Sequence, residues 1–473
     1  MKNKLIEDIL KNKEIILLSL IILFGVFLRL YSLGNSPLWV DESISSETAK
    51  QILNTGVPRF ESGMIDTRAF VFHYIQSFFM IFGINEFSVR LVSVLFGILT
   101  IFFGYYIGKE YSKSGGIIFA LFLSVFYLEV FFSRQARMYQ MFQLLFFLSI
   151  YFLYKSKENV KYLYWGLIIL IVCYDTHIAG IVLAPFFLIY ILVYNRNKWY
   201  LSFVPVFLLI WNFMPIAGLS SNSVENTVSY ASSYLAYLKN WYYLVVLFVL
   251  GGIWSFFKKK ELTFLILTPS LLMLFGVFSL ETFALRYEYF FIFPLVMYSS
   301  LLIAFLYDKY GKIILIPLLI LFIVPSNLFY PLNYVNIITP INYNYNDASA
   351  PYTDYKNLPT DLLLKLKSNT TLISFFSLDV KWYVKNPDFV IPFSLDGRGN
   401  DQISFNSSNG NLVDRYSGVR ILNYSNLPEI PYYVLADSFS VSKLKPSQNI
   451  NFNTLIANCS LSYSATDLKV YSC

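Results

Sequence analysis

The chain carries two adjacent carboxylates, Asp41 and Glu42, in the polar stretch 35–42 directly after its first apolar segment. Neighbouring acids at a membrane surface repel each other and are costly to desolvate. Such a pair usually accepts a proton, holds a metal ion or pairs with cations. When the pair is considered alone, a solvated loop explains it equally well. The surrounding elements must therefore show whether the pair has a chemical role or lies in a solvated loop.

Further polar side chains gather at the ends of apolar segments that we expect to face outward. They are Arg29; Asp66 and Arg68; Arg134, Arg137 and Tyr139; Asp175 and His177; and Glu281, Arg286 and Tyr287. Positively charged side chains on the outer side are unusual, because Lys and Arg are usually more frequent in cytoplasmic loops. Each alone is more simply an interfacial anchor, since Arg side chains reach readily to the membrane surface. Together they predict a cavity at the outer membrane surface.

Carboxylates and guanidinium groups in one cavity have complementary chemical uses. Arg side chains clamp phosphate groups through paired hydrogen bonds. A carboxylate acts as a general base toward a hydroxyl group. A membrane-embedded substrate that carries phosphate and is attacked by an outside acceptor would need both.

Composition places these residues in a polytopic membrane protein. Of 473 residues, 56% are hydrophobic and only 14% charged, whereas about a quarter are charged in a soluble domain. The net charge of +7 fits cytoplasmic Lys and Arg anchors. We expect no nucleic-acid partner, because no basic amphipathic stretch carries base-reading aromatic side chains.

Apolar segments alternate with Lys-rich loops, and these loops fall on one side throughout. We predict helices over about 15–33, 87–108, 116–132, 138–154, 162–175, 178–194, 199–217, 241–257, 262–280, 288–307 and 313–330. The alternation indicates about 11 transmembrane helices with a cytoplasmic N-terminus and an outer C-terminus. The first segment lacks a cleavage site, so it is read as a helix and not as a signal peptide.

The first outer loop, residues 34–86, is expected to hold two interfacial helices. Residues 43–65 have amphipathic spacing, and residues 69–83 are apolar but short for a span, so we expect an interfacial or re-entrant helix there. This loop belongs to a predicted transmembrane domain over 1–330.

Residues 331–473 form a second predicted domain, a small extracytoplasmic α/β domain. Alternating apolar residues from Thr371 and from Tyr432 predict strands, and Thr360 to Leu366 predicts a helix. Four Asn-x-Ser/Thr sequons agree weakly with an outer location: Asn369, Asn406, Asn423 and Asn458.

Cysteine and histidine are scarce. The chain has three Cys and two His, and this scarcity argues against a cysteine-based metal site. We expect Cys459 and Cys473 to form a disulfide, which requires an oxidising compartment, and Cys173 to be a packing residue. No cofactor is certain. A divalent metal ion is conceivable, with His177 and Asp66 as candidate ligands, although a single His at a helix end is more often structural.

The order of motifs resembles the polytopic GT-C glycosyltransferases that use polyprenyl-phosphate-linked sugars. The closest groups are the protein mannosyltransferases and the lipid A aminoarabinose transferases. The matching stretches lie within about 15–330 and are Leu38-Trp-Val-Asp-Glu42, residues 82–97, Ser133-Arg-Gln-Ala-Arg-Met-Tyr139, Thr176-His177 and Leu285-Arg-Tyr287.

The resemblance implies roles for individual residues. Asp41 would deprotonate the acceptor, and Glu42 would support it or bind the acceptor. Asp66 and Arg68 stand where the family often has an acid and a base before a Pro-Pro-Leu-Tyr-like helix, although this chain has Ala69-Phe-Val-Phe-His73 there. The residues that would hold the lipid phosphate are Arg134, Arg137, Arg286 and Tyr287.

The implied reaction is a single inverting displacement at the anomeric carbon, with polyprenyl phosphate as the leaving group. The donor sugar would be mannose or another hexose or pentose. The acceptor would be a protein, a glycan or a lipid. The reaction needs no nucleotide, and the chain has neither a Walker nor a dinucleotide-binding signature.

Three other functions compete with this one. A transporter or flippase of lipid-linked sugars would have polar midplanes and discontinuous helices, whereas the predicted midplanes are mostly apolar. A non-enzymatic glycan-binding protein would carry its function in the outer domain. An oligosaccharyltransferase would have a Trp-Trp-Asp-type motif in that domain, and the sequence has none.

Overall fold

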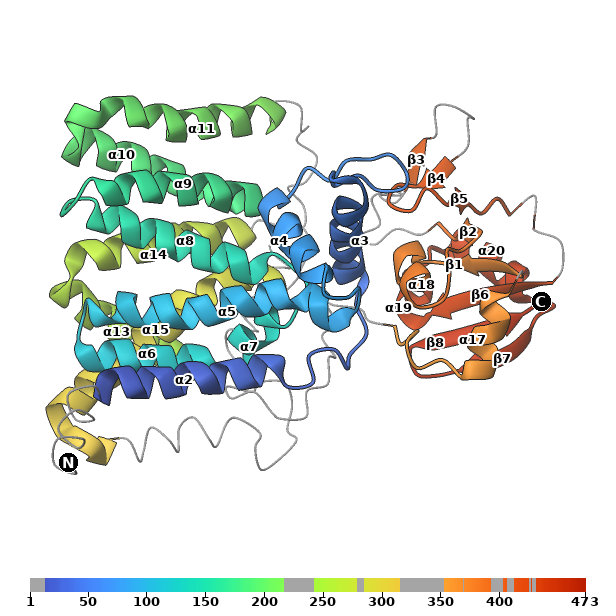
Figure 1. Ribbon diagram of the computed structural model, residues 1–473, viewed down its shortest axis with the longest axis horizontal. Coiled ribbons are helices and arrows are strands. Elements are labelled where there is room, and N and C mark those ends of the chain that lie inside the picture. Colours follow the sequence, from blue (N-terminus) through green and yellow to red (C-terminus); the bar gives the residue numbers. More distant parts are fainter. Residues whose placement is uncertain are drawn as a thin grey trace. The chain divides into compact units, whose positions relative to one another are not determined.

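The computed structural model describes residues 13–216, 242–278, 285–314, 353–368, 370–392, 403–405, 412–424, 427 and 431–473 (Figure 1). The chain divides into two compact units. The bundle unit comprises Met1–Tyr31 and Arg90–Tyr343, and the loop–sheet unit comprises Ser32–Val89 and Asn344–Cys473. The first outer loop therefore belongs with the C-terminal region, although the sequence pattern had grouped it with the transmembrane helices.

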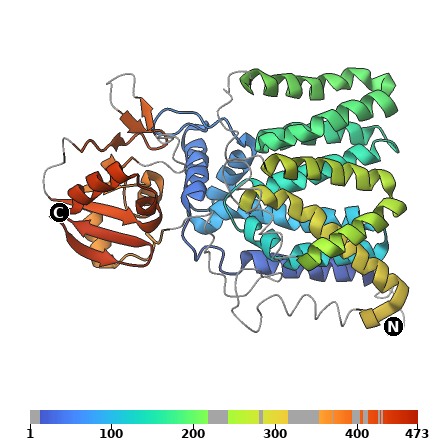
Figure 2. The ribbon, with the colours of Figure 1, turned by 180° about the vertical axis from the view of Figure 1, so that it is seen from behind.

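The apolar segments of the bundle unit form helices close to the predicted positions. They are α2 (Lys13–Leu30), α5 (Glu86–Lys109), α6 (Lys113–Val125), α7 (Tyr127–Ser133), α8 (Tyr139–Lys155), α9 (Lys161–Thr176), η1 (Ile178–Leu183), α10 (Ala184–Tyr194), η2 (Arg196–Ser202), α11 (Phe203–Ile216), α13 (Tyr242–Lys258), α14 (Lys260–Phe278), α15 (Leu285–Tyr310) and η3 (Gly311–Ile314). Helices α8 to α11 lie side by side in both views (Figures 1 and 2).

Three helical segments among the described residues are long and apolar enough to cross a bilayer. They are Glu86–Lys109, Lys260–Val277 and Tyr289–Ile313. Shorter apolar helices cover Lys113–Val125, Ile178–Tyr194 and Tyr242–Lys258. The count of about 11 spans stays a prediction, and most of the expected last helix, 313–330, falls outside the described residues.

The helix predicted over 116–132 is broken in two. Phe126 has an extended backbone (φ −63°, ψ 128°) between α6 and α7. The fully buried Arg29 guanidinium donates to the carbonyl oxygens of Leu123 (3.0 Å) and Ser124 (3.1 Å), which the break leaves without helical partners. Gly97 makes room for this contact, because a Cβ there would lie 2.7 Å from Arg29 Nε.

Two short helices form the first outer loop. Helix α3 (Val40–Thr55) ends at Gly56, whose positive φ of 77° is the left-handed conformation common at helix C-termini. The amphipathic helix expected over 43–65 is thus shorter than predicted. Helix α4 (Phe70–Met80) has 11 residues, too few to cross a bilayer, in agreement with its prediction as a short, non-spanning helix.

The described residues of the C-terminal region form an eight-stranded mixed sheet with the order β3-β4-β5-β2-β1-β6-β8-β7. Its strands are β1 (Thr371–Ser374), β2 (Phe389–Val390), β3 (Ile403–Phe405), β4 (Leu412–Asp414), β5 (Arg420–Ile421), β6 (Tyr432–Asp437), β7 (Ser460–Ser464) and β8 (Leu468–Ser472). The central strand β1 runs parallel to both β2 and β6. The strands predicted from Thr371 and Tyr432 are confirmed.

Helices cover both faces of this sheet because its strands alternate between two apolar cores. Ile373 and Val434 pack with α20 (Pro446–Ile456) on one face. Leu372 and Leu435 pack on the other face with α17 (Thr360–Lys367) and α18 (Ser377–Tyr383). Two buried faces account for the near-continuous apolar sequence of β1 and β6. The expected mixed α/β character of the C-terminal region is confirmed, and the domain bounds 331–473 stay a prediction.

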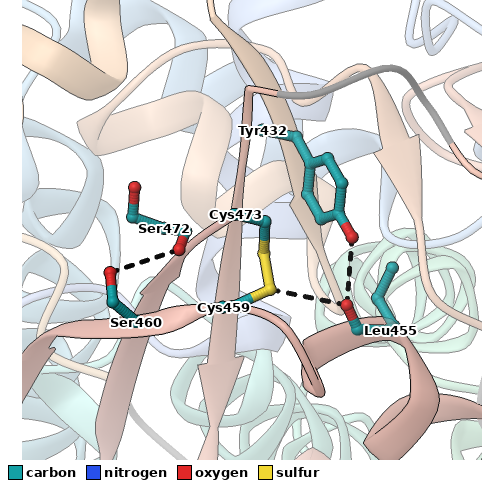
Figure 3. Close-up of a disulfide and its surroundings, with 6 residues drawn as sticks. All are labelled: Tyr432, Leu455, Cys459, Ser460, Ser472 and Cys473. Carbon is teal, nitrogen blue, oxygen red and sulfur yellow. Dashed lines mark hydrogen bonds between the residues drawn. A yellow bond between two sulfur atoms is a disulfide. The ribbon is translucent and has the colours of Figure 1, made fainter.

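A disulfide joins Cys459 to Cys473, as predicted (Figure 3). It closes the open end of the β7–β8 hairpin, where Ser460 pairs with Ser472. The neighbouring Leu455 carbonyl oxygen accepts a hydrogen bond from the Tyr432 hydroxyl at 3.0 Å, which ties α20 to the same corner. Cys173 is a free, buried thiol.

The disulfide can be tested by thiol counting and by stability. Alkylation of the denatured, unreduced protein should modify one thiol, and prior reduction should raise the number to three. Replacing both Cys459 and Cys473 by Ser should lower the free energy of unfolding of the sheet by about 3 kcal/mol, because the bridge closes a loop of about 15 residues. Ser460→Ala, at an exposed position of the same hairpin, is the control. Three thiols before reduction would contradict the bridge.

Candidate active site

The two adjacent carboxylates lie in the first turn of α3 but in different environments. Glu42 is fully buried, and its Oε2 accepts a hydrogen bond from the Trp39 N–H at 3.3 Å. That contact satisfies one of the N–H groups that a helix start leaves open. Asp41 is only half-buried. The structure therefore gives Glu42 a helix-capping contact and leaves Asp41 as the carboxylate of the pair that solvent reaches.

Asp66 joins α3 to α4 through a second carboxylate contact. Its Oδ2 accepts a hydrogen bond from the Thr48 hydroxyl at 3.2 Å and lies 3.6 Å from His73 Nε2. Thr48 is two helical turns after Asp41, about 10 Å further along the axis. Arg68 is exposed, and its backbone N–H donates to Asp66 Oδ1 at 3.1 Å.

His73 is a site residue that sequence reasoning did not single out. It is 3% exposed, and its Nδ1 lies 3.4 Å from Gln76 Oε1. Its two ring nitrogens thus lie near oxygen atoms of Asp66 and Gln76. The available signal was its rarity: the chain has two His, and this one follows Asp66 in the first turn of a helix.

Helix α18 of the sheet packs against α3. Lys381 Nζ lies 2.7 Å from Glu47 Oε1 on α3 and 2.7 Å from Glu61 Oε1 in the following loop. Two residues on, the Tyr383 hydroxyl accepts a hydrogen bond from the Leu38 N–H at 2.7 Å, just before α3 begins. The Glu47 side chain is 4% exposed, so Lys381 neutralises a buried charge.

Four further contacts hold the loop to the C-terminal region. Lys356 Nζ donates to the Gly34 carbonyl oxygen at 2.7 Å and lies 2.9 Å from Glu86 Oε1, so one side chain joins the beginning and the end of the loop. In the middle of the loop, Ser62 donates to the Arg415 carbonyl oxygen, and the Phe60 ring meets Tyr416 edge-on at 5.3 Å.

Arg134 makes a helix-capping contact in the bundle unit. It is 8% exposed, and its Nη1 donates to the carbonyl oxygens of Leu28 (2.9 Å) and Tyr31 (2.7 Å) at the end of α2. These oxygens lie where a helix leaves carbonyl groups without partners. At least one of the four predicted phosphate ligands thus also has a structural contact.

The other predicted phosphate ligands lie near helix starts of the same unit. The Arg137 guanidinium carbon lies 5.6 Å from the ring centroid of Tyr139, a buried residue that begins α8. Arg286 is half-buried in the first turn of α15. The side chain of Tyr287 and all of Glu281 are outside the described residues.

A buried polar network in the bundle unit was not predicted. Glu129 is fully buried; its Oε1 accepts from Gln143 Nε2 at 2.9 Å, and its Oε2 lies 3.0 Å from the Tyr289 hydroxyl. Gln140 Nε2 extends the network to Thr100 Oγ1 at 2.9 Å. The members lie on four helices, α5, α7, α8 and α15, so no local pattern in the sequence connects them. The expectation of apolar helix interiors does not hold for these helices.

The described residues contain no group of three or more His, Cys, Asp or Glu side chains arranged to hold a metal ion. His177 Nδ1 instead accepts a hydrogen bond from the Ala179 N–H at 3.2 Å and so caps η1, while its ring packs on Phe142. Asp66 has Thr48 and His73 as its neighbours.

The chain is similar to known proteins both in sequence and in fold. Residues 67–219 match the family model described as dolichyl-phosphate-mannose-protein mannosyltransferase. The fold is similar to that of ArnT from Cupriavidus metallidurans in the apo state, with a TM-score of 0.63 and 11% identity over 96% of this chain and 97% of that chain. The structure of ArnT bound to undecaprenyl phosphate also has a TM-score of 0.63 and 11% identity, over 98% of each chain.

A more distant likeness is to the oligosaccharyltransferase of Archaeoglobus fulgidus, solved in complex with Zn and sulfate. The TM-score is 0.52 and the identity 13%, over 78% of this chain and 61% of that chain. No curated protein matches the sequence significantly. The resemblance to the GT-C glycosyltransferases is confirmed. A GT-C fold with apolar helices makes this a multi-pass membrane protein.

The matched family model covers some candidate residues and not others. Arg68, Arg134, Arg137, Tyr139 and His177 fall within the matched range 67–219. Asp41 and Glu42 precede it, so the roles implied for them depend on motif order and on the geometry of α3.

Removal of Lys381 should loosen the loop. Lys381→Ala leaves the Glu47 carboxylate buried without its cation, which should destabilise the loop–sheet unit by about 3 kcal/mol. The measurement is the rate of proteolysis within 56–65, together with the melting temperature. Lys365→Ala, an exposed lysine on α17, should change neither value. Wild-type protease resistance in the Lys381 variant would refute the role of this ion pair.

Proposed function

We propose that this GT-C protein transfers a sugar from a polyprenyl-phosphate donor to an acceptor at the outer face of the membrane, with Asp41 as general base. The observation that carries the proposal is that the two carboxylates in the first turn of α3 have different environments. Glu42 is buried as a helix cap, while Asp41 remains within reach of solvent and of an acceptor. One protein of similar fold, ArnT, has been solved bound to undecaprenyl phosphate, which supports this class of donor.

The proposed chemistry is one displacement. The Asp41 carboxylate takes the proton of the acceptor hydroxyl as that oxygen forms a bond to the anomeric carbon. The bond between this carbon and the phosphate oxygen breaks, and polyprenyl phosphate leaves with the electron pair. Attack opposite to the leaving group inverts the configuration. A general base contributes about a hundredfold to ten-thousandfold to such a step.

The arginines are proposed to stabilise the leaving phosphate. Arg137 and Arg286 are half-buried, and partial desolvation strengthens an ion pair with phosphate. Tyr139 supports Arg137 through its ring face. Arg134 and Tyr287 complete the proposed phosphate-binding set, and Arg134 has the additional contact with the end of α2.

Asp66 is proposed as a supporting acid near the acceptor. Thr48 and His73 fix its carboxylate between α3 and α4. The proposed sidedness places the N-terminus in the cytoplasm and the C-terminal domain outside it. The disulfide supports the outer location, because such bonds persist in oxidising compartments.

A flippase of lipid-linked sugars is the second candidate, because transporters often have broken helices and buried polar groups. The break at Phe126 and the Glu129 network are features of this kind. Here Arg29 fills the break and the network residues bond to one another, which favours a structural role. Translocation of a labelled lipid-linked sugar in proteoliposomes, without any transfer to an acceptor, would favour the flippase.

Asp41→Asn tests the base directly. The substitution preserves shape but removes the proton acceptor, so kcat should fall by about a thousandfold. The measurement is transfer of labelled sugar from polyprenyl-phosphate mannose, and from other lipid-linked sugars, to candidate acceptors. Asp361→Asn, an exposed acid on α17, is the matched control. Transfer at the wild-type rate by a folded, membrane-inserted Asp41→Asn protein would reject the mechanism.

Arg137→Ala tests the phosphate clamp. Loss of a charge-assisted contact with phosphate should raise KM for the donor, or lower kcat/KM, by roughly tenfold or more. Arg196→Ala is the control, because Arg196 is exposed and its Nε donates to the backbone carbonyl oxygen of Leu192 in the preceding helix α10. Unchanged donor kinetics in the Arg137 variant would remove this residue from the proposed site.

A further inference from the structure

The buried network around Tyr289 joins α8 to α15, the two helices at whose starts Arg137 and Arg286 lie. The Tyr289 hydroxyl lies 2.5 Å from Gln140 Oε1 and 3.1 Å from Gln143 Oε1, both on α8. The side chains of Tyr289, Gln140 and Gln143 are fully buried. Water therefore does not compete for these hydrogen bonds, and they hold one point of α15 to the start of α8.

Both arginines are three residues before a member of this network. Arg286 precedes Tyr289 in α15. Three helical residues rise about 4.5 Å and share one helix face, so Arg286 is on the Tyr289 face of α15, nearly one turn nearer its start. Arg137 precedes Gln140 in the segment that leads into α8. The contact between Tyr289 and Gln140 thus fixes the distance between the two backbone segments that carry the guanidinium groups.

A further hydrogen bond fixes the backbone of Arg137 itself. The Ser93 hydroxyl on α5 is fully buried and donates to the Arg137 carbonyl oxygen at 3.0 Å. Three residues earlier, the Arg134 side chain binds the carbonyl oxygens at the end of α2. The segment between α7 and α8 is therefore held at both arginines and, through Gln140, at the helix that follows.

Beyond the network, the contact between α8 and α15 is made by aromatic rings. Phe142 meets Phe290 edge-on at 4.6 Å, and Phe147 stacks on Phe293 at 4.1 Å. Ring contacts tolerate small displacements, whereas hydrogen bonds weaken steeply with distance and angle. The hydroxyl of Tyr289 is therefore the group that sets the register of the two helix starts.

We propose that Tyr289 is a positioning residue whose hydroxyl, through Gln140 and Gln143, holds Arg137 and Arg286 at the separation that binds the donor phosphate. This inference rests on the proposed function, in which these two arginines contact that phosphate. It gives the buried network a part in donor binding, which Ser93 supports through the Arg137 backbone.

The first experiment measures the binding of undecaprenyl phosphate to the purified protein, with undecaprenol as the probe that lacks phosphate. Tyr289→Phe removes the hydroxyl and keeps the ring. The Kd for undecaprenyl phosphate should rise about tenfold, because a misplaced guanidinium loses its charge-assisted hydrogen bonds, while the Kd for undecaprenol should change less than about twofold. In transfer assays the same variant should raise donor KM and change kcat less than about twofold.

Tyr298→Phe is the matched control. Tyr298 lies on the same helix, is fully buried, and its hydroxyl lies 3.4 Å from the Thr263 carbonyl oxygen, away from both arginines in the sequence of α15. Its removal should leave both Kd values within about twofold of wild type. An unchanged Kd for undecaprenyl phosphate in Tyr289→Phe, or an equal loss for both lipids, would overturn the inference.

The second experiment asks whether Tyr289 acts through Arg137. In an Arg137→Ala background, Tyr289→Phe should raise the Kd for undecaprenyl phosphate by less than about threefold, against about tenfold in wild type, because one of the two positioned guanidinium groups is gone. Tyr298→Phe should have the same small effect in both backgrounds. Fully multiplicative effects of Tyr289→Phe and Arg137→Ala would show that the hydroxyl acts on stability alone and would reject positioning.

Ser93→Ala provides a second test if Tyr289→Phe does not fold. Loss of the hydrogen bond to the Arg137 carbonyl oxygen should raise the Kd for undecaprenyl phosphate about threefold to tenfold and spare undecaprenol. Wild-type affinity for undecaprenyl phosphate in a folded Ser93→Ala protein would contradict the inference.

These measurements separate failure of the inference from failure of the proposed function. Transfer by wild type, combined with unaltered lipid binding in Tyr289→Phe, would reject the inference alone. Absence of transfer from every lipid-linked donor would reject the proposed function, and the binding measurements would still decide whether Tyr289 positions the arginines. Absence of undecaprenyl phosphate binding by wild type would overturn both.

Discussion

A carboxylate that leaves water must find a cation, hydrogen-bond donors or a proton, and this requirement orders the loop–sheet unit. Glu42 has the Trp39 N–H, Glu47 has Lys381, and burial raises the pKa of Asp379 to about 8. The Glu47–Lys381 pair also joins α3 to α18. Asp41 is the acid of α3 that keeps a half-exposed position, and this contrast makes it the best candidate for proton transfer.

The helical patterns of the sequence predicted most helices of the bundle unit to within a few residues, because apolar periodicity reflects burial. In the C-terminal region, the sequence patterns predicted β1, β6 and α17 and missed the other elements. The helix break at Phe126 escaped prediction, since no Pro or Gly marks it and its carbonyl groups are satisfied by Arg29 from another helix. The Cys459–Cys473 bridge was predictable because both residues lie in the one region expected to be oxidised.

The candidate site was predictable only in part. Residue type and position pointed to Asp41, Asp66 and the arginines, but not to their partners. His73 was missed because its significance depends on contacts that only folding creates. Arg29 and Arg134 both bind backbone carbonyl groups at helix ends, and residue type and spacing did not predict these contacts.

Lys356 ties Gly34 to Glu86, so the beginning and the end of the loop are held by one residue of the C-terminal region. The loop and the sheet are therefore a single module, although the whole of 90–343 separates them along the chain. Attempts to exchange substrate preference between GT-C proteins by grafting segments would have to move 32–89 together with 344–473. If only one of the two segments were grafted, charged partners such as Glu47 and Lys381 would come from different proteins.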